Sequence, residues 1–268
     1  MSNKKYLVET SAVPVALGES TTRHCDHFAE ATADGELWTS IYVRKEFIAR
    51  WILSYIRMAF VADHFQDLAE AQYHLSQDFS IRDVKTQVHA VGVLLQTKGK
   101  ITSTRAMAKE LARLALGELR KFDKLLKRRT RNACGCQIGG KEMKIDFNNL
   151  FDDLRAFCES QGSVENCDVN KFLGIGKIGR ASQFVANKEV VTKTTAGRNL
   201  AKRLSEQKPI ACEACATIGD AVIAPEQPKP WCLVHIDHDF EILCAATSRQ
   251  RKSILSERAI ETDVPELR

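Results

Sequence analysis

The sequence predicts an α/β fold with a central parallel sheet, and three observations support this class. Short apolar runs that suit buried strands lie near the two ends of the chain, at residues 5–9 and 231–236. Helical patterns fill the region between them. Because parallel strands are joined by helical crossovers, we expect a core at 1–60 and 208–268 and a long, mostly helical insertion at 61–207.

The elements follow in chain order from the spacing of apolar residues. KYLVE, residues 5–9, is a short apolar run ending in an acid, which is typical of a buried strand. From Leu37 the apolar residues recur every three or four positions, which predicts one long helix or two in succession. A second helical pattern covers residues 103–131, with Thr102 or Ser103 as its N-cap. We expect a polar helix near 195–206 and a last strand at WCLVHI, residues 231–236.

Composition bounds the class of protein. The 268 residues are 44% apolar and 27% charged, which lies in the ordinary globular range. The amino terminus lacks the pattern of a secretory signal, and no stretch approaches about 18 uninterrupted apolar residues. We therefore expect a cytoplasmic protein without a membrane partner. In that compartment the nine cysteines are expected to be reduced thiols or metal ligands.

Positive charge is concentrated in one segment. The net charge is +5, and residues 120–132 contain seven basic residues against one acid. Such density favours a surface that faces a polyanion such as a nucleic acid. A solvated helix end is the alternative, because cations suit a helix C-terminus. The candidate nucleic-acid ligands are Lys121, Lys124, Lys127, Arg128, Arg129 and Arg131.

Four acids lie at or near element ends: Glu9, Glu46, Asp220 and Asp237. Taken singly, each has an ordinary explanation as a solvated strand end, a surface residue or, for Asp220, an N-cap. If folding brings them together, they cannot all stay ionised without a compensating charge. Hard oxygen ligands suit Mg²⁺ or Mn²⁺, which can activate a water for attack on a phosphodiester.

The segments around these acids are LVETSAV, YVRKEF, IGDAVIA and LVHIDHDF. In order and character they resemble the motifs of the PIN-domain nucleases, over about residues 4–60 and 208–245. The resemblance implies a PIN-like central parallel sheet flanked by helices, and metal-dependent cleavage of RNA or, less often, DNA. It also implies that the four acids are catalytic and hold Mg²⁺ or Mn²⁺. Ser11 would support the site, and Asp239 is the alternative to Asp237 as fourth ligand.

Three residues depart from that family pattern. The first acid is Glu9 where the family usually has Asp, so the carboxylate is one methylene further from the backbone. His235 stands where Thr or Ser is common. Pro225 follows IGDAVIA closely enough to shorten or kink the helix expected there. None of these changes removes a carboxylate.

Two close cysteine pairs indicate a structural zinc site. Cys134 and Cys136 form one pair in a glycine-containing loop, and Cys212 and Cys215 form the other. Four thiolates from two short pairs are a usual ligand set for structural zinc, although the first pair is tighter than the common spacing. Buried unpaired cysteines or a redox dithiol are the alternatives. The remaining cysteines have the surroundings of small core residues.

The sequence therefore predicts a Mg²⁺- or Mn²⁺-dependent endoribonuclease that uses four carboxylates and carries structural zinc. The alternative is a catalytically decayed, PIN-like nucleic-acid-binding or scaffold protein, in which Glu9 marks the loss of activity. A redox protein that uses Cys212 and Cys215 is a third interpretation. RNA is the expected partner, and a second copy of the chain or a protein inhibitor is compatible with this family.

Overall fold

The computed structural model describes residues 4–67, 69–71, 73, 101–128, 193–206 and 212–254. The chain divides into two compact units. The bounds of these units differ from the division at residues 60 and 208 that the sequence suggests, and that division stays a prediction. The first unit comprises Met1–Arg44, Lys124–Gly140 and Val164–Arg268, and the second comprises Lys45–Asp123 and Lys141–Ser163.

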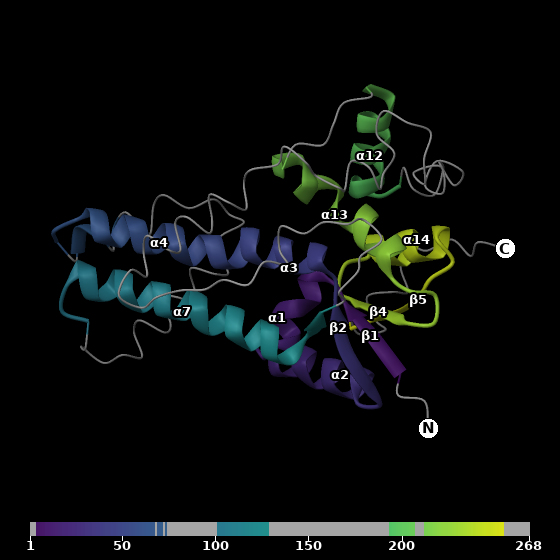
Figure 1. The fold of residues 1–268 in the computed structure, drawn as a ribbon, viewed down its shortest axis with the longest axis horizontal. Coiled ribbons are helices and arrows are strands. Elements are labelled where there is room, and N and C mark those ends of the chain that lie inside the picture. The colour runs from purple at the N-terminus through teal and green to yellow at the C-terminus, as the bar shows by residue number, and fades with distance from the viewer. Residues whose placement is uncertain are drawn as a thin grey trace. The chain divides into compact units, whose positions relative to one another are not determined.

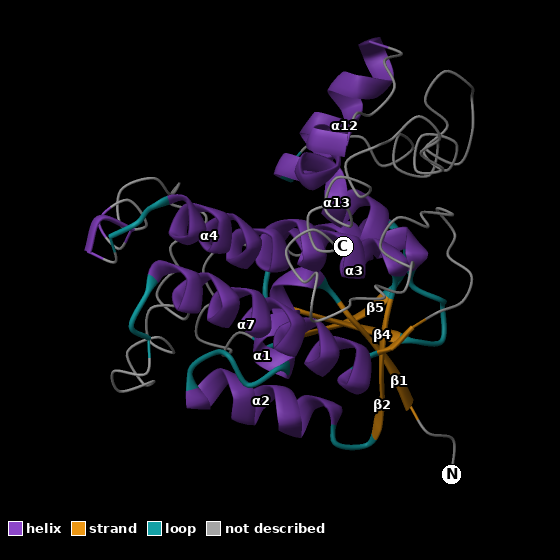
Figure 2. Cartoon of the chain, turned by 60° about the vertical axis from the view of Figure 1, so that its left-hand side comes forward, coloured by secondary structure: helices purple, strands orange, loops and turns teal. Residues whose placement is uncertain are grey.

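The first unit contains a five-stranded sheet in which all neighbouring strands run parallel (Figure 2). The spatial order is β3-β2-β1-β4-β5, so the chain builds outward from β1 in one direction and later in the other. The predicted α/β class with a parallel sheet is therefore confirmed. The strands are β1 (Lys4–Val8), β2 (Gly35–Thr39), β3 (Lys127–Arg128), β4 (Cys232–His235) and β5 (Gln250–Ser253).

β1 is the central strand, and its second half is fully buried. Leu7 and Val8, whose side chains point to opposite faces, both have an exposed fraction of 0%. β1 pairs with β2 on one side and with β4 on the other, so that Tyr6 lies opposite Leu37 and Cys232. A strand buried on both faces has a continuous apolar sequence, which is why the run YLV was recognisable.

Helices cover both faces of this sheet (Figure 1). On one face the Lys252 ammonium donates to the backbone carbonyl of Ala31 in α2 at 3.0 Å. On the other face Arg251 donates to Glu241 in α14, because successive side chains of β5 point to opposite faces. The helices of this unit are η1 (Thr10–Ala12), α1 (Val13–Ala16), α2 (Thr22–Thr32), α12 (Thr195–Glu206), α13 (Cys212–Glu226) and α14 (Asp239–Ala246).

The second unit is helical in the part that the structure describes. The Phe47 ring stacks on the Phe122 ring with centroids 4.8 Å apart, and the Trp51 ring lies 6.4 Å from Phe47. Tyr55 and Leu111 of the same unit are fully buried. The helices are η2, a π-helical segment (Ile48–Ile52), α4 (Leu53–His64) and α7 (Thr104–Leu125), while α3 (Ile41–Phe47) crosses the boundary between the units.

The helix predicted from Leu37 starts later than its apolar pattern indicates. Leu37 and Trp38 belong to β2 and pair with β1. The hydroxyl of Ser40 then accepts a hydrogen bond from the amide of Val43 at 3.1 Å, which caps the start of α3. The helical prediction was therefore wrong for residues 37–39, because a strand of five residues is too short to show its own periodicity beside a long helix.

The second predicted helix is confirmed as α7 but ends at Leu125. Ser103 is its N-cap, since its hydroxyl accepts from the amide of Ala106 at 3.2 Å. The prediction was wrong for residues 127 and 128, because Lys127 and Arg128 form β3 and pair with β2, and residues 129–131 lie outside the described part of the chain. The polar helix predicted near 195–206 is confirmed as α12, and the last predicted strand as β4.

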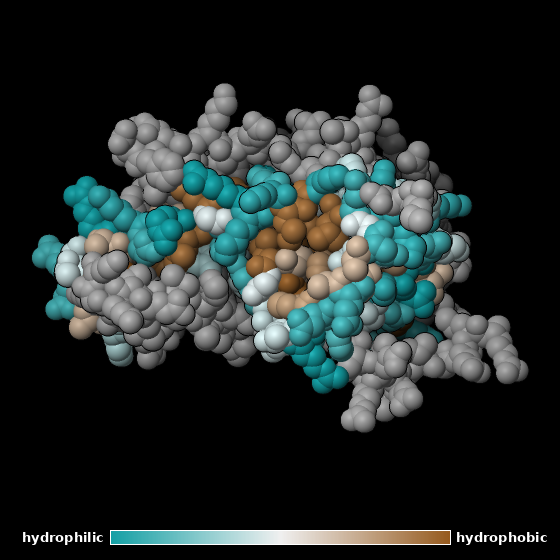
Figure 3. Space-filling model, turned by 90° about the horizontal axis from the view of Figure 1, so that it is seen from below, coloured by the Kyte–Doolittle hydropathy of each residue, from teal (hydrophilic) through white to brown (hydrophobic). Residues whose placement is uncertain are grey.

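The described surface is largely hydrophilic. In Figure 3, hydrophilic residues border a group of apolar residues on the face that is drawn. Among the described residues, the large apolar side chains with a high exposed fraction are Tyr73 at 61% and Leu125 at 38%. Within the same residues, no helix combines the length and the apolar character needed to span a membrane.

Candidate active site

The strand order places a candidate site at the carboxyl ends of β1 and β4. These two strands are parallel neighbours, and the direction in which the chain builds the sheet reverses between them. Ligands of open α/β sheets bind at such a point, in the crevice beyond the carboxyl ends of the strands. Glu9 is the first residue after β1, and Asp237 follows β4 by two residues.

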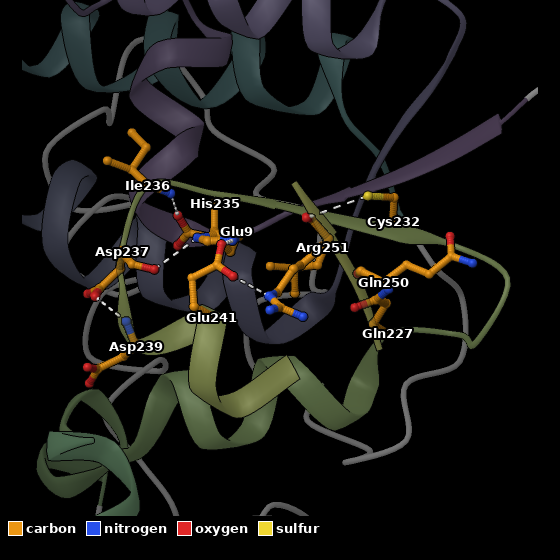
Figure 4. Close-up of polar contacts among 11 residues, drawn as sticks. Glu9, Gln227, Cys232, His235, Ile236, Asp237, Asp239, Glu241, Gln250 and Arg251 are labelled. Carbon is orange, nitrogen blue, oxygen red and sulfur yellow. Dashed lines mark hydrogen bonds and ion pairs between the residues drawn. The ribbon is translucent and has the colours of Figure 1, made fainter. Parts of the chain in front are cut away.

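The Glu9 side chain joins the ends of these two strands (Figure 4). Its carboxylate accepts hydrogen bonds from the Ser11 amide at 2.6 Å, from the Ser11 hydroxyl, and from the Ile236 amide at 3.2 Å. The Glu9 amide also donates to the carbonyl of Val234 at 3.2 Å. Residues that are 227 positions apart in the sequence therefore meet through one carboxylate.

Burial makes the charge of Glu9 costly. Only 1% of this residue is exposed, and burial raises the pKa of its carboxyl above the ordinary value. The hydrogen bonds from Ser11 and Ile236 act in the opposite direction, because they stabilise the charged form. Glu9 is therefore a buried acceptor at the strand ends, with about one of its four lone-pair positions unused.

His235 holds the backbone that follows β4. Its side chain is fully buried, and Nδ1 lies 2.9 Å from the carbonyl oxygen of Asp237. Since that oxygen is an acceptor, Nδ1 carries the proton and donates. His235 Nε2 lies 3.1 Å from Oε1 of Glu241, whose other oxygen accepts from Arg251. These contacts tie the end of β4 to α14 and β5 (Figure 4).

The contacts of Glu241 keep it ionised. The close contact with His235 and the ion pair with Arg251 lower the pKa of Glu241 from 4.5 to about 2, against the effect of burial. Glu241 and Arg251 were missed by the sequence analysis. Glu241 follows closely after HIDHDF, but its pairing depends on how α14 packs against β5, which no local pattern reveals.

Asp237 and Asp239 form a pair of carboxylates at the start of α14. Asp237 is exposed, and its Oδ1 accepts from the Asp239 amide at 2.9 Å. Asp239 is half-buried, and its Oδ2 accepts from the Thr195 amide at 3.2 Å. Burial and the charge of Asp237 raise the pKa of Asp239 above its ordinary value. A nearby cation would relieve this repulsion.

The other two predicted acids occupy helices. Asp220 is half-buried in α13 and is not an N-cap, because the helix begins at Cys212. Pro225 lies in the last turn of this helix, which ends at Glu226. Glu46 lies in α3 with an exposed fraction of 5%. It falls in the second unit, whereas Glu9, Asp220 and Asp237 fall in the first.

The donor chemistry of this site fits a hard cation. Asp237 and Asp239 offer carboxylate oxygens, the ligands that Mg²⁺ and Mn²⁺ prefer. Within the part of the chain that the structure describes, no three His, Cys, Asp or Glu side chains form a group that could hold a metal ion. The pair at the start of α14 therefore fits two ligand positions, and the four-carboxylate metal site stays a prediction.

The predicted zinc ligands lie largely outside the described residues. Cys134 and Cys136 fall there completely, and of Cys212 and Cys215 only the backbone, in the first turn of α13, is described. Zinc stays a prediction. Of the other cysteines, Cys244 is buried, and burial raises the pKa of its thiol to about 12. A thiol with so high a pKa is unreactive, in agreement with a small core residue.

The predicted basic segment does not form one helical strip. Lys121 and Lys124 belong to α7, whereas Lys127 and Arg128 belong to β3. Arg129 and Arg131 lie outside the described residues. Lys121 pairs with Glu118 at 2.7 Å, and Lys127 pairs with Glu36 at 2.7 Å. Part of this charge is therefore balanced by carboxylates, and nucleic-acid binding by the segment stays a prediction.

Comparison with known proteins gives no further information about this site. No family model, curated protein or solved structure matches the chain.

Proposed function

We propose that the protein is a Mg²⁺- or Mn²⁺-dependent nuclease of PIN-like architecture that hydrolyses phosphodiester bonds in RNA. The observation that carries this proposal is the hydrogen bond from the Ile236 amide to the Glu9 carboxylate at 3.2 Å. It brings the first and last acidic motifs together at the carboxyl ends of adjacent parallel strands. Open α/β sheets bind their ligands at this position.

Each residue of the site has a distinct role in this proposal. Asp237 and Asp239 would hold the divalent ion, with Asp220 of the same unit as a further acidic ligand. A divalent ion at these carboxylates would supply a water of lowered pKa and would stabilise negative charge on the phosphate. Glu9 contributes its remaining lone pair and, together with Ser11, fixes the end of β1. His235 fixes the carbonyl of Asp237 and hence the backbone that carries both aspartates.

Substitution of Asp237 tests the proposal. In Asp237→Asn the side chain keeps an oxygen that can accept from the Asp239 amide but loses its charge. We expect cleavage of a single-stranded RNA with Mg²⁺ or Mn²⁺ to fall by about 100-fold or more, the scale of losing one positioned catalytic group. The matched control is Asp26→Asn, an exposed aspartate of α2, which should leave cleavage unchanged. Equal activity of Asp237→Asn and wild type would exclude the assignment.

The alternative is a nucleic-acid-binding protein that has lost catalysis. One observation favours it: the two oxygens of the Glu9 carboxylate together accept three hydrogen bonds from the chain itself. A protein of this kind would bind RNA with affinity that falls as salt rises, and would cleave nothing with either metal. The same cleavage assay, run on the wild type alone, separates the two functions.

A further inference from the structure

We propose that three exposed cations, Lys193 in the turn before α12 and Arg198 and Lys202 on α12, bind the phosphodiester backbone of a single nucleic-acid strand that leads to Asp237 and Asp239. The inference rests on the proposed nuclease function and names the surface that holds its substrate. It concerns residues outside every motif that the sequence analysis selected for binding.

The helix presents Arg198 and Lys202 on its solvent side, and the exposed Lys193 lies in the turn before it. Thr194 caps α12 by accepting from the Gly197 amide at 2.9 Å. Ala196 and Leu200, with exposed fractions of 4% and 1%, anchor the apolar side of the helix. Residues three and four apart share a helix face, so Arg198 and Lys202, both exposed, are neighbours on the opposite side.

The first turn of α12 is attached to the candidate site. The Thr195 amide donates to Oδ2 of Asp239 at 3.2 Å, so the helix begins beside the acidic pair. Arg198 donates to the hydroxyl of the same Thr195 at 3.2 Å, so its guanidinium also lies near the acidic pair. A strand bound along α12 would therefore run directly to the carboxylates.

Arg198 is held in place before any ligand arrives. Its Nη1 donates to the carbonyl of Lys193 at 3.1 Å, and its Nη2 donates to the hydroxyl of Thr195 at 3.2 Å. Such contacts reduce the conformational entropy that the side chain loses when it binds a phosphate. The rise along the helix from Arg198 to Lys202 is about 6 Å, which lets two long side chains reach successive phosphates.

The cations of α12 and its preceding turn differ from those of the basic segment at residues 120–132 in their ion-pair partners. Lys121 and Lys127 are paired with Glu118 and Glu36. Among the ion pairs within the described part of the chain, none joins a carboxylate to Lys193 or to Lys202 (residues of α12 and the turn before it). Lys193 and Lys202 can therefore attract a polyanion toward a site whose own carboxylates would repel it.

The test measures binding in the absence of cleavage. The ligand is a fluorescein-labelled single-stranded uridine oligonucleotide in EDTA, and binding of the full chain is followed by anisotropy over a series of salt concentrations. For single strands the slope of log K against log salt is about −0.7 per neutralised phosphate, so Lys193→Gln/Arg198→Gln/Lys202→Gln should reduce the slope by about 0.7 × 3 ≈ 2. Affinity at low salt should fall about tenfold or more.

The matched control is Arg105→Gln/Lys109→Gln, which removes two exposed cations with the same four-residue spacing from α7. It should keep the wild-type slope. If the triple variant loses helical circular dichroism, Lys193→Gln/Lys202→Gln keeps the internal contacts of Arg198 and should still reduce the slope by about 1.4. An unchanged slope in folded variants, or a wild type that binds no oligonucleotide, would overturn the inference.

The nuclease proposal is checked separately in the same material. Asp237→Asn should lose cleavage but keep the wild-type salt slope, because the cations of α12 are intact. Cleavage that depends on Asp237 together with an unchanged slope in the triple variant would sink only the binding surface. A slope that depends on α12 without any cleavage would sink only the nuclease.

Discussion

The environments at the two edges of the sheet shift the pKa values of Asp34 on one side and of Glu9 and Asp239 on the other in opposite directions. At the amino-terminal edge, Asp34 accepts hydrogen bonds from the Lys4 ammonium and from the Tyr6 hydroxyl, both at 2.6 Å. These contacts hold the pKa of Asp34 at about 2. At the carboxyl edge, the pKa values of Glu9 and Asp239 are both raised, in each case mainly by burial.

The difference separates an edge whose carboxylate is satisfied by a cation from an edge whose carboxylates are poorly accommodated. A carboxylate beside a cation is satisfied, and its site gains little from another ion. Carboxylates that are buried or crowded are poorly accommodated, and groups with such raised pKa values cluster at functional sites. The contrast agrees with the position of ligand sites at the carboxyl ends of parallel strands.

The largest expected change in stability comes from removing the Glu9 carboxylate, and removal of the Asp34 carboxylate at the other edge is the comparison. In Glu9→Ala, the amides of Ser11 and Ile236 lose their acceptor in a buried environment. We expect the free energy of unfolding to fall by about 3 kcal/mol, because each unsatisfied buried donor costs about 1–3 kcal/mol. Asp34 is exposed, so its contacts should contribute far less to stability. Asp34→Ala should therefore lower the free energy of unfolding, measured with urea, by much less than Glu9→Ala. Equal losses in the two variants would contradict the proposed difference between the edges.

Close backbone packing, more than ion pairing, should set the stability of the amino-terminal edge. A Cβ atom at Gly35 would lie 2.5 Å from the Lys4 carbonyl oxygen and 2.6 Å from Cε2 of Tyr6. We expect Gly35→Ala to destabilise the protein by about 1–3 kcal/mol, the range for overpacking. Thermal and urea unfolding measure this.

Gly117 provides a control of opposite sign. It lies inside α7, where a Cβ atom would meet nothing within 4 Å. Gly117→Ala should therefore stabilise the protein by up to about 1 kcal/mol, the difference in helix propensity. If Gly35→Ala were also neutral or stabilising, the tight approach of β2 to β1 would not be a source of stability.

The sequence predicts those elements whose own periodicity is complete. β1, β4, α7 and α12 were recognisable from apolar runs or helical spacing. β5, with the sequence QRKS, contains no apolar residue and has strand geometry only because it pairs with β4. β3 has two residues and depends in the same way on β2. Such edge strands are properties of the assembled sheet.

The same distinction applies to the candidate site, where some residues could be predicted from the sequence and others could not. Glu9 and Asp237 could be selected because they follow recognisable strands, and a parallel sheet brings such ends together. The contacts of Asp239 with α12 and of Glu241 with Arg251 could not be predicted. They join elements that are distant in the sequence or that meet only when the helices pack on the sheet. Sequence reasoning reached the acids at the strand ends and missed the residues that hold these acids in place.

Glu241 gives the smallest expected effect and separates a satisfied acid at the carboxyl edge from its crowded neighbours. Its pKa is lowered from 4.5 to about 2, so the ionised form stabilises the fold above pH 4.5 and this stabilisation is lost as the pH falls toward 2. We expect Glu241→Gln to lower the free energy of unfolding at pH 7 by about 1 kcal/mol or less, the range for a partly exposed ion pair. The variant should therefore unfold at a lower urea concentration than the wild type.

The difference between Glu241→Gln and wild type should shrink as the pH falls below 4.5, because the unfolded wild type then binds a proton at Glu241 that it must release to fold. Urea unfolding at pH 7, 4.5 and 3 measures this convergence. Glu30→Gln, an exposed glutamate of α2, is the matched control and should follow the wild type at each pH. A difference for Glu241→Gln that stays constant from pH 7 to 3 would mean that its contacts with His235 and Arg251 do not depend on charge. The carboxyl edge would then owe its order to the shape of α14 against β5 alone.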